Sequence, residues 1–296
     1  MREEDRQKIE TLAEALDGAE RILIGAGAGL SAAAGLSYFD EEVFKTWFPA
    51  LLKEGYRCQY NLVGFGDEDW SLGRKWAYWA THVHYVREVF PSAPLYHELL
   101  ALLQGRDWFV VTSNADRQFF RAGFPMERVF EYQGSYDNMG CSVPCGRHTW
   151  NSLEPLARAR EFIDPETFTC APEGIPRCPV CGAPAEMCFR PENYAEGRDR
   201  YVDFVNGSEG KRLVLVELGV GFNTPGVIRW PFERICRALP EARLFRVNRG
   251  YLDYPGHKGY PTVPPELGER AMAIDCDAAE VITALWEMQG GCPASP

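Results

Sequence analysis

The sequence predicts an α/β protein: a doubly wound, parallel, Rossmann-like sheet with a helical insertion and a smaller cysteine-containing module. Short apolar runs alternate with helical patterns, as a parallel sheet with crossover helices requires. Residues 21–35 pass from an apolar run through closely spaced glycines into alanines, the order of a strand, a tight turn and a helix. Two cysteine pairs lie in a proline-rich segment with little periodicity.

The composition excludes several classes of partner. The chain has 296 residues, of which 46% are hydrophobic and 25% charged, as in ordinary soluble globular proteins. Its formal net charge of -11 argues against nucleic acid, because phosphate binding needs a basic surface. No apolar run approaches the roughly 20 residues of a membrane span. Charges fill residues 2–8, where a secretory signal needs an apolar core, so we expect a cytoplasmic protein.

The N-terminal residues predict a nucleotide-binding turn. Apolar residues at helical spacing predict a helix over 3–16, and 21–24 form a strand. Glycines such as Gly27 and Gly29 let a backbone approach a pyrophosphate, and the first N–H groups of the next helix point at it. Their spacing departs from the usual dinucleotide fingerprint, so a close-packed corner between strand and helix is the alternative.

A mainly helical stretch is expected from 41 to 90. It is rich in aromatic residues, most of which we assign to the core and a minority to a substrate groove. His82 and His84 do not share a helical face, which argues against a ligand role. A further helix is expected over 94–103, where a proline begins it and a glycine follows it.

Polar residues follow the next two predicted strands. Residues 108–112 form an apolar run typical of a buried strand, and Asn114 and Asp116 come directly after it. Open α/β sheets bind ligands at this end of their strands. A short strand at 128–132 leads to Gln133. The structural alternatives are an Asx turn for Asn114, a helix cap for Asp116 and a loop hydrogen bond for Gln133.

The segment 138–200 predicts a small zinc-binding module. Two cysteine pairs separated by a poorly patterned loop are typical of a tetrahedral zinc site with four thiolate ligands, here Cys141, Cys145, Cys178 and Cys181. Such a site is structural, because four thiolates leave no open position for water. His148, Cys170 and Cys188 are alternative ligands.

The C-terminal part completes the sheet. Strands are expected at 211–216, 243–247 and 271–274, and helices at 231–239 and 278–288. The first of these strands runs into a second glycine turn. Glu217 lies at the end of that strand, where it could serve as an acid or base, although a solvated or hydrogen-bonded carboxylate is the simpler interpretation.

Taken together, these turns resemble the sirtuins, the NAD-consuming deacylases and ADP-ribosyltransferases. Residues 27–31 (Gly-Ala-Gly-Leu-Ser) are similar to the family's Gly-Ala-Gly-x-Ser signature, and 112–116 (Thr-Ser-Asn-Ala-Asp) to its Thr-Gln-Asn-x-Asp. The cysteine pairs match its zinc module in place and kind. Residues 219–221, Asn248 and 275–276 fall where the family contacts adenosine. The resemblance covers nearly the whole chain.

Two departures from the family pattern are informative. The family's catalytic histidine lies in a His-Gly pair, which here reads Gln133-Gly134. Its Pro-Asp-Phe-Arg reads Ser-Tyr-Phe-Asp at 37–40, so the arginine is missing. Glutamine at this place, together with Gly-Val-Gly-Phe-Asn-Thr-Pro-Gly at 219–226, is similar to the class M (macrodomain-linked) sirtuins.

The resemblance implies specific roles for residues. Asn114, Asp116 and Gln133 are the implied catalytic residues: Asn114 orients the nicotinamide ribose, Asp116 holds the carboxamide, and Gln133 hydrogen-bonds ribose hydroxyls. The implied NAD-binding residues are these three together with Gly27, Ala28, Gly29, Ser31, Gly219, Gly221, Asn223, Asn248 and Cys276. The NAD-binding domain would comprise 1–137 and 201–296 with the insertion at about 41–90, and the structural zinc module 138–200.

The function implied is NAD-dependent protein ADP-ribosylation, with release of nicotinamide. In some class M members the acceptor is a lipoyl-carrier protein, and macrodomain hydrolases are associated partners. Three alternatives remain: an NAD-dependent deacylase that uses another group in place of the histidine, an NAD hydrolase, and a module that senses NAD or ADP-ribose without chemistry.

Overall fold

The computed structural model describes residues 2–62, 69–143, 145–146, 148–222, 224–250 and 262–291. The chain divides into two compact units, which are described separately. Unit 1 comprises Met1–Gly35, Ser92–Gln133 and Asn193–Pro296, and unit 2 comprises Leu36–Pro91 and Gly134–Glu192. By this division the helical insertion belongs with the cysteine-containing segment. Among the described residues, none of the helices combines the length and apolarity needed to cross a membrane.

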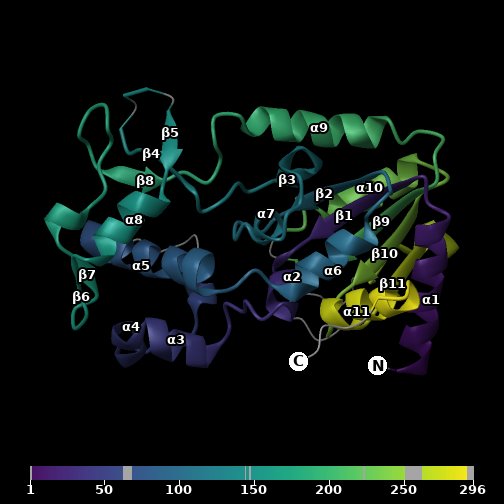
Figure 1. Ribbon diagram of the computed structural model, residues 1–296, viewed down its shortest axis with the longest axis horizontal. Helices are drawn as coiled ribbons and strands as arrows, with labels where there is room; N and C mark the ends of the chain where they lie inside the picture. Colours follow the sequence, from purple (N-terminus) through teal and green to yellow (C-terminus); the bar gives the residue numbers. More distant parts are fainter. Residues whose placement is uncertain are drawn as a thin grey trace. The chain divides into compact units, whose positions relative to one another are not determined.

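Unit 1 is built on a six-stranded parallel sheet with helices on both faces (Figure 1). The strand order is β11-β10-β9-β1-β2-β3, and every neighbouring pair is parallel. The order reverses between β1 and β9, which makes their carboxyl ends the topological switch point of a Rossmann-like fold. The strands are β1 (Arg21–Ala26), β2 (Trp108–Thr112), β3 (Val129–Glu131), β9 (Leu213–Leu218), β10 (Arg243–Val247) and β11 (Ala271–Ile274).

The helices of unit 1 follow from amphipathic patterns and terminal signals. Helix α6 begins at a proline, and the Asp277 side chain caps α11 by accepting a hydrogen bond from Ala279 N–H. The helices are α1 (Glu3–Asp17), α2 (Ala28–Ala33), α6 (Pro94–Leu102), α7 (Gln118–Arg121), α9 (Tyr194–Asn206), α10 (Arg229–Ala238) and α11 (Ala278–Met288), with 3-10 turns η3 (Met126–Arg128) and η6 (Pro265–Arg270).

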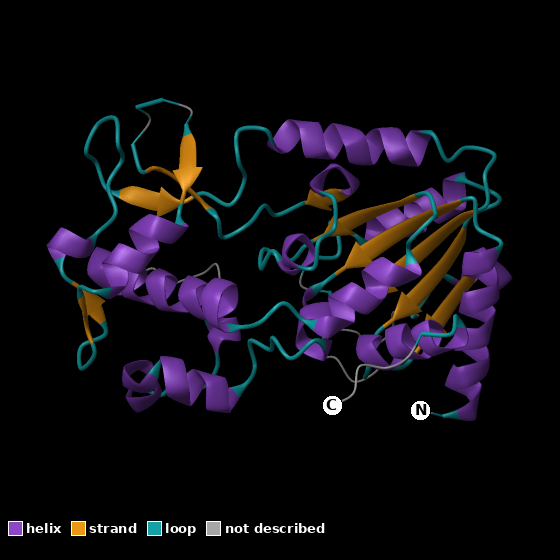
Figure 2. Cartoon of the chain, viewed as in Figure 1, coloured by secondary structure: helices purple, strands orange, loops and turns teal. Residues whose placement is uncertain are grey.

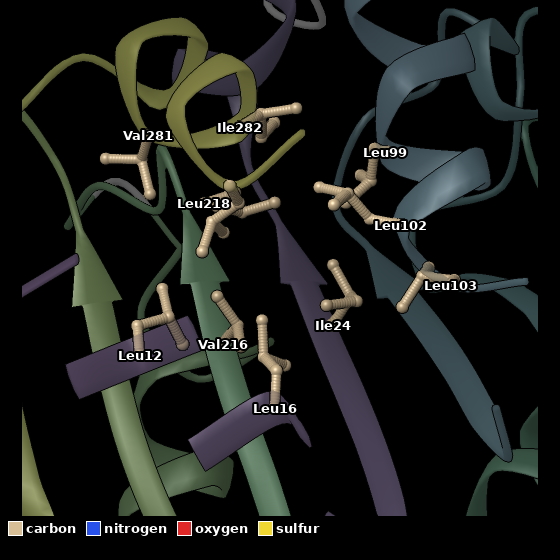
Figure 3. Close-up of a pocket in the computed structure, with 11 residues that line it drawn as sticks. Leu12, Leu16, Ile24, Leu99, Leu102, Leu103, Val216, Leu218, Val281 and Ile282 are labelled. Atoms are coloured by element: carbon tan, nitrogen blue, oxygen red, sulfur yellow. The ribbon is translucent and has the colours of Figure 1, made fainter. Parts of the chain in front are cut away.

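The two faces of the sheet are covered by different helices. Leu23 and Ile24 are neighbours on β1 and point to opposite faces, as strand geometry requires. Leu23 lies in a cluster with residues of α10, including Phe232. Ile24 faces α1, α6 and α11, where aliphatic side chains line a cavity of about 20 Å³ (Figure 3). The walls of this cavity are apolar, so it is a packing gap rather than a binding site.

Unit 2 contains short helices and small antiparallel sheets (Figure 2). Strands β4, β5 and β8 form one sheet in the order β5-β4-β8, and β6 pairs with β7. Its elements are α3 (Glu41–Trp47), α4 (Pro49–Lys53), η1 (Gln59–Asn61), α5 (Leu72–His84), η2 (Tyr85–Val89), β4 (Asn138–Cys141), β5 (Thr149–Asn151), α8 (Leu153–Arg160), β6 (Ile163–Asp164), β7 (Thr169–Cys170), η4 (Pro172–Gly174) and β8 (Ala185–Met187).

Two helices differ from the sequence-based expectations. Helix α8 lies within the stretch expected to be an unpatterned loop, and α9 begins at Tyr194, where no helix was predicted. Both have few fully buried residues: α8 buries Leu156 and Ala159, and α9 buries Gly197. Asp40, which stands where the family has arginine, is the N-cap of α3 and accepts hydrogen bonds from the N–H groups of Glu42 and Val43.

The core of unit 2 includes a buried histidine. His82 is completely buried, its ring stacks on Tyr78, and its Nδ1 lies 2.7 Å from Gln59 Oε1. A carbonyl oxygen can only accept, so Nδ1 carries the proton of a neutral ring. Burial lowers the pKa of His82 to about 3. His82 is therefore a core residue, in keeping with the expectation that it is not a ligand.

We predict that His82 makes the stability of the protein depend on pH. Its pKa is lower in the folded state than the usual 6.5, so the contribution of the neutral ring is complete above pH 6.5 and falls as the pH drops toward 3. The expected loss is about 1.4 kcal/mol per pH unit. Chemical unfolding of wild type and His82→Phe between pH 7 and 4 measures it. The variant should lose this dependence, whereas His97→Gln, at an exposed histidine, should keep it. Parallel pH curves for all three proteins would contradict the assignment.

Candidate functional site

The predicted site residues gather at one edge of the sheet in unit 1. They follow the carboxyl ends of all six strands, which share that edge because the sheet is parallel. Gly27, Ala28, Gly29 and Ser31 follow β1; Asn114 and Asp116 follow β2; Gln133 follows β3; Gly219 and Gly221 follow β9; Asn248 follows β10; and Cys276 follows β11. Asn223 lies outside the described residues. The structure thus brings side chains that are distant in sequence to the switch-point edge.

Two glycine turns touch at the switch point. Gly27 N–H donates to Leu218 O at 3.0 Å, and Gly29 N–H donates to Gly219 O at 2.9 Å. A Cβ atom on Gly29 would lie 2.6 Å from Gly219 Cα, and one on Gly219 would lie 2.3 Å from the Gly29 carbonyl carbon. Gly219 also has φ +61°, a left-handed conformation that favours glycine. Glycine is therefore required here by backbone contact.

A hydrogen-bonded cluster lies beside the first turn. Ser31 Oγ donates to Asp116 Oδ2 at 2.6 Å, and Asn114 Nδ2 donates to Ser31 Oγ at 3.0 Å and to Gly27 O at 2.9 Å. Tyr96, which the sequence analysis missed, places its hydroxyl 2.9 Å from Ser31 Oγ. The side chains of all four residues are at least nine-tenths buried. The cluster fixes an amide and a carboxylate at the end of β2.

Asn114 and Asp116 also hold the local backbone. The Asn114 N–H donates to Thr112 Oγ1 at 3.0 Å, and Asp116 Oδ1 accepts from the Gln118 N–H at 3.0 Å, at the start of α7. Asn114 and Asp116 therefore take part both in the local turn and in the hydrogen-bonded cluster. One carboxylate oxygen of Asp116 supports the turn, while the other belongs to the cluster.

Gln133 is half-buried and follows β3 by two residues. Its predecessor Tyr132 is fixed on both sides, because its N–H donates to Thr112 O at 2.9 Å and its carbonyl accepts from the Tyr194 hydroxyl at 2.6 Å. The backbone that carries Gln133 is therefore tied to β2, the strand that Asn114 follows. An amide side chain can donate and accept hydrogen bonds, but it does not gain or lose a proton near neutral pH and so cannot act as a base.

The residues expected near adenosine lie on the other side of the switch point. Asn248 Nδ2 lies 3.5 Å from Val220 O and links the end of β10 to the second glycine turn. Gly221 is exposed, and a Cβ there would meet nothing within 4 Å. Cys276 is buried, and burial is the main cause that raises the pKa of its thiol. Cys276 is therefore a neutral thiol.

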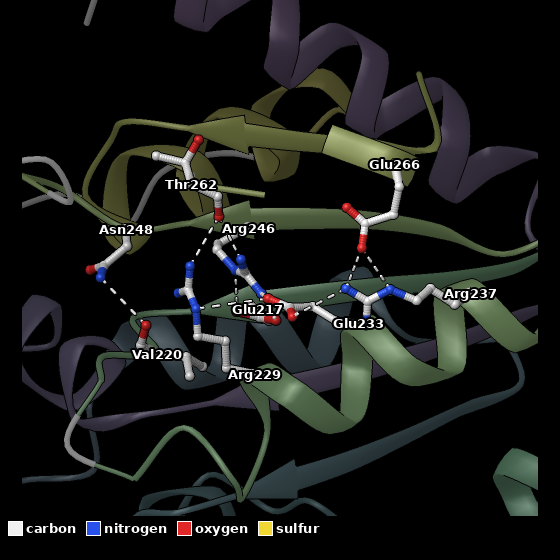
Figure 4. Close-up of polar contacts among 9 residues, drawn as sticks. All are labelled: Glu217, Val220, Arg229, Glu233, Arg237, Arg246, Asn248, Thr262 and Glu266. Atoms are coloured by element: carbon white, nitrogen blue, oxygen red, sulfur yellow. Dashed lines mark hydrogen bonds and ion pairs between the residues drawn. The ribbon is translucent and has the colours of Figure 1, made fainter. Parts of the chain in front are cut away.

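Glu217 is a structural residue, which excludes the acid–base role considered above (Figure 4). It is completely buried and pairs bidentately with Arg246, through bonds of 2.6 and 2.8 Å. Its register partner on β10 is the same Arg246. Glu233 accepts a further bond from Arg246 at 3.1 Å. Glu217 and Arg246 each precede a turn residue, Gly219 and Asn248, by two positions, so this pair aligns the two strands beneath the predicted adenosine site.

The four predicted zinc ligands converge in unit 2. The sulfur atoms of Cys141, Cys145, Cys178 and Cys181 all lie within 4.8 Å of one another. The Sγ–Sγ distance is 3.5 Å between Cys141 and Cys181 and 3.6 Å between Cys145 and Cys178. A zinc tetrahedron with Zn–S bonds of about 2.3 Å has edges of about 3.8 Å. The donor set therefore fits a structural zinc ion.

Within the cluster the surroundings of Cys178 favour a thiolate, whereas burial raises the pKa of Cys141 and the neighbouring Cys141 sulfur raises the pKa of Cys145. His148 Nε2 lies 3.3 Å from Cys178 Sγ. Burial opposes ionisation of Cys178, but the N–H groups of Cys181 and Val180 and the His148 ring lower its pKa to about 6. The other two alternative ligands lie elsewhere: Cys170 Sγ interacts with Ala159 O, and Cys188 Sγ with Arg190 O. His148 thus contacts a ligand sulfur rather than replacing a cysteine.

Sequence comparisons identify relatives over most of the chain. No family model matches it. A probable bifunctional ADP-ribose hydrolase/ADP-ribosyltransferase of Fusarium oxysporum f. sp. cubense is 39% identical over 251 residues, 80% of this chain and 42% of that protein. A protein ADP-ribosyltransferase of Staphylococcus aureus is 29% identical over 297 aligned residues, covering 95% of this chain and 88% of that protein. The chain therefore spans less than half the length of the fungal relative and most of the bacterial one.

Structural comparisons identify the fold. The crystal structure of a Sir2 homologue–NAD complex superposes with a TM-score of 0.60 at 17% identity, covering 94% of this chain and 93% of that one. A structure described as the structural basis of sirtuin substrate affinity gives a TM-score of 0.59 at 18% identity, covering 95% of this chain and 99% of that one.

A deacylase is also similar in sequence. An NAD-dependent protein deacylase 2 of Pseudomonas aeruginosa is 31% identical over an alignment that covers 58% of this chain and 64% of that protein.

We predict that the two glycines of the second turn respond differently to alanine. Gly219→Ala should lower the free energy of unfolding by more than about 2 kcal/mol, because the new Cβ meets the Gly29 backbone and the residue is left-handed. Gly221→Ala should change it by less than about 0.5 kcal/mol, because its Cβ enters open space. Urea unfolding measures both. Equal effects of the two substitutions would contradict the proposed close contact.

We also predict one zinc ion bound by the cysteine cluster. Elemental analysis of the purified protein should find about one equivalent, and Cys178→Ser should lose it and destabilise unit 2, because structural zinc contributes directly to folding. Cys58→Ser is the matched control, at a cysteine outside the cluster, and should retain the metal. Full metal content in the Cys178 variant would rule out this ligand set.

Proposed function

We propose that the chain, which has the fold of the Sir2 structures described above, is a sirtuin-type NAD-dependent enzyme that transfers ADP-ribose to a protein. The observation that carries the proposal is Gln133, which places an amide where the sirtuins that this chain resembles have a histidine base. The two relatives described above are named as ADP-ribosyltransferases, which supports the same choice. We propose further that the chain is of the class M type.

The clustered side chains suit cleavage of the nicotinamide–ribose bond. In our proposal Asn114 orients the nicotinamide ribose and Asp116 holds the carboxamide, both fixed in advance by the cluster with Ser31. The bond between C1′ and the nicotinamide nitrogen breaks, and its electron pair leaves with nicotinamide. An acceptor nucleophile then forms a bond to C1′ and releases its proton to water. We propose that the pyrophosphate lies beside the two glycine turns, which hold each other through their backbone contact.

Gln133 decides between transfer and deacylation. In deacylation a base must take a proton from a ribose hydroxyl, and loss of a positioned base costs about 10²–10⁴-fold in rate. This corresponds to roughly 3–5.5 kcal/mol of activation free energy. Cleavage of the glycosidic bond does not need that base. We therefore propose that Gln133 hydrogen-bonds ribose hydroxyls and that transfer outpaces deacylation.

The acceptor and its partners are further parts of the proposal. The class M resemblance suggests a lipoyl-carrier protein as the acceptor and a macrodomain hydrolase as a partner. The fungal relative joins ADP-ribose hydrolase and ADP-ribosyltransferase in its name, and this chain spans 42% of it. That arrangement supports a hydrolase that acts together with this chain. A deacylase is the second candidate, because relatives with that name are also similar.

We predict that the protein releases nicotinamide from NAD and labels a lipoylated carrier protein, and that Asn114→Ala abolishes both reactions with the fold intact. Labelled NAD with the carrier protein, followed by mass spectrometry of the adduct and chromatography of nicotinamide, measures them. Asn206→Ala, on the exposed side of α9, should retain full activity.

Other outcomes identify the alternatives. Acyl-peptide turnover without transfer would favour the deacylase, and nicotinamide release without an adduct would favour the hydrolase. NAD binding without nicotinamide release would favour the sensor. A fully active Asn114→Ala would remove that residue from the site.

A further inference from the structure

Tyr96 is held rigidly beneath the cluster of Ser31, Asn114 and Asp116. It lies in the first turn of α6 and is completely buried. Its ring packs edge-on against Phe119 of α7, with centroids 4.9 Å apart at 86°. The hydroxyl lies 2.9 Å from Ser31 Oγ. A large fixed side chain thus connects α6 to the cluster at the end of β2, and it is not part of any motif in the sequence.

The donors and acceptors of the cluster can be assigned from their chemistry. The Asp116 carboxylate can only accept, so the single Ser31 proton is directed to it across 2.6 Å. Asn114 Nδ2 donates one proton to Gly27 O and the other to Ser31 Oγ. Ser31 then has one acceptor position left, which takes the proton of Tyr96. The oxygen of Ser31 thus makes one donated and two accepted hydrogen bonds.

The Tyr96 hydroxyl remains a donor over the physiological pH range. Burial is the main cause that raises its pKa well above 10, and the charge of Asp116 adds to the effect. The polar side chains of Ser31 and Asn114 act in the opposite direction and do not overcome it. The hydroxyl therefore keeps its proton beside the Asp116 carboxylate.

We infer that Tyr96 is a positioning residue, whose hydroxyl fixes the orientation of Ser31 and, through it, of Asn114 and Asp116. The inference rests on the proposed function for its kinetic consequence. Without the hydroxyl, Ser31 loses one of the two donors that hold its oxygen and can rotate away from Asp116. The amide and carboxylate at the end of β2 then lose their common partner. Binding of NAD through the glycine turns is left in place.

The variant Tyr96→Phe tests this directly, because it keeps the ring that packs on Phe119 and removes only the hydroxyl. Loss of one buried hydrogen bond corresponds to about a fivefold effect. We expect the rate constant kcat for nicotinamide release to fall by about fivefold or more, with the KM for NAD unchanged within about twofold. Tyr96→Phe combined with Ser31→Ala should be no slower than Ser31→Ala alone, because both changes remove the same contact.

A matched control is available in Tyr78. Tyr78 is also a buried tyrosine, but within the described part of the chain its hydroxyl has no hydrogen-bond partner. Tyr78→Phe should leave kcat and KM unchanged. An unchanged kcat in Tyr96→Phe, or effects of Tyr96→Phe and Ser31→Ala that multiply in the double variant, would overturn the positioning role.

Crystal structures of wild type and Tyr96→Phe without ligand separate this inference from the proposed function. We expect Ser31 to change rotamer in the variant and the Asn114–Ser31 bond to be lost. Unchanged Ser31 and Asn114 side chains would overturn the inference whatever the activity. Wild-type protein that releases no nicotinamide would instead refute the proposed function, and the side-chain positions would still decide the role of Tyr96.

Discussion

The backbone contact between the two glycine turns is the constraint on which the rest of the site depends. Gly29 donates to Gly219 O, and no side chain fits between the two turns. This contact brings the end of β1 against the end of β9, where the strand order reverses. A parallel sheet opens a crevice at such a point, and the two turns form the part of its floor at which β1 and β9 end.

The two faces of the sheet contribute differently to this edge. The face beneath α1, α6 and α11 is a dry aliphatic layer, so it supplies burial and little specificity of position. The face beneath α10 contains the charged network of Glu217, Arg246 and Glu233 near the carboxyl edge. Hydrogen bonds between charged groups are directional, so this face sets the register of β9 against β10.

Much of the fold could be predicted from the sequence, because β1, β2, β9 and β10 are buried on both faces. The apolar runs of β2, β10 and β11 have the predicted bounds, as does α11. Helices α8 and α9 could not be predicted, since tertiary packing rather than a strong apolar stripe stabilises them. The zinc ligands, which converge as predicted, could be identified because the two cysteines of each pair are close in sequence, which is a local signal. Glu217 and Tyr96 are different: their partners are 29 and 65 residues away, which no local pattern encodes.

The buried Glu217–Arg246 pair also constrains how this sequence can diverge. Removing Arg246 alone would leave the buried Glu217 carboxylate without its bidentate partner, which typically costs several kcal/mol, whereas without Glu217 the arginine would keep its bond to Glu233. Replacing both with apolar residues of similar volume is often neutral. Among descendants of this chain Arg246 should therefore be lost only together with Glu217, and lineages that keep the glutamate without the arginine should be absent.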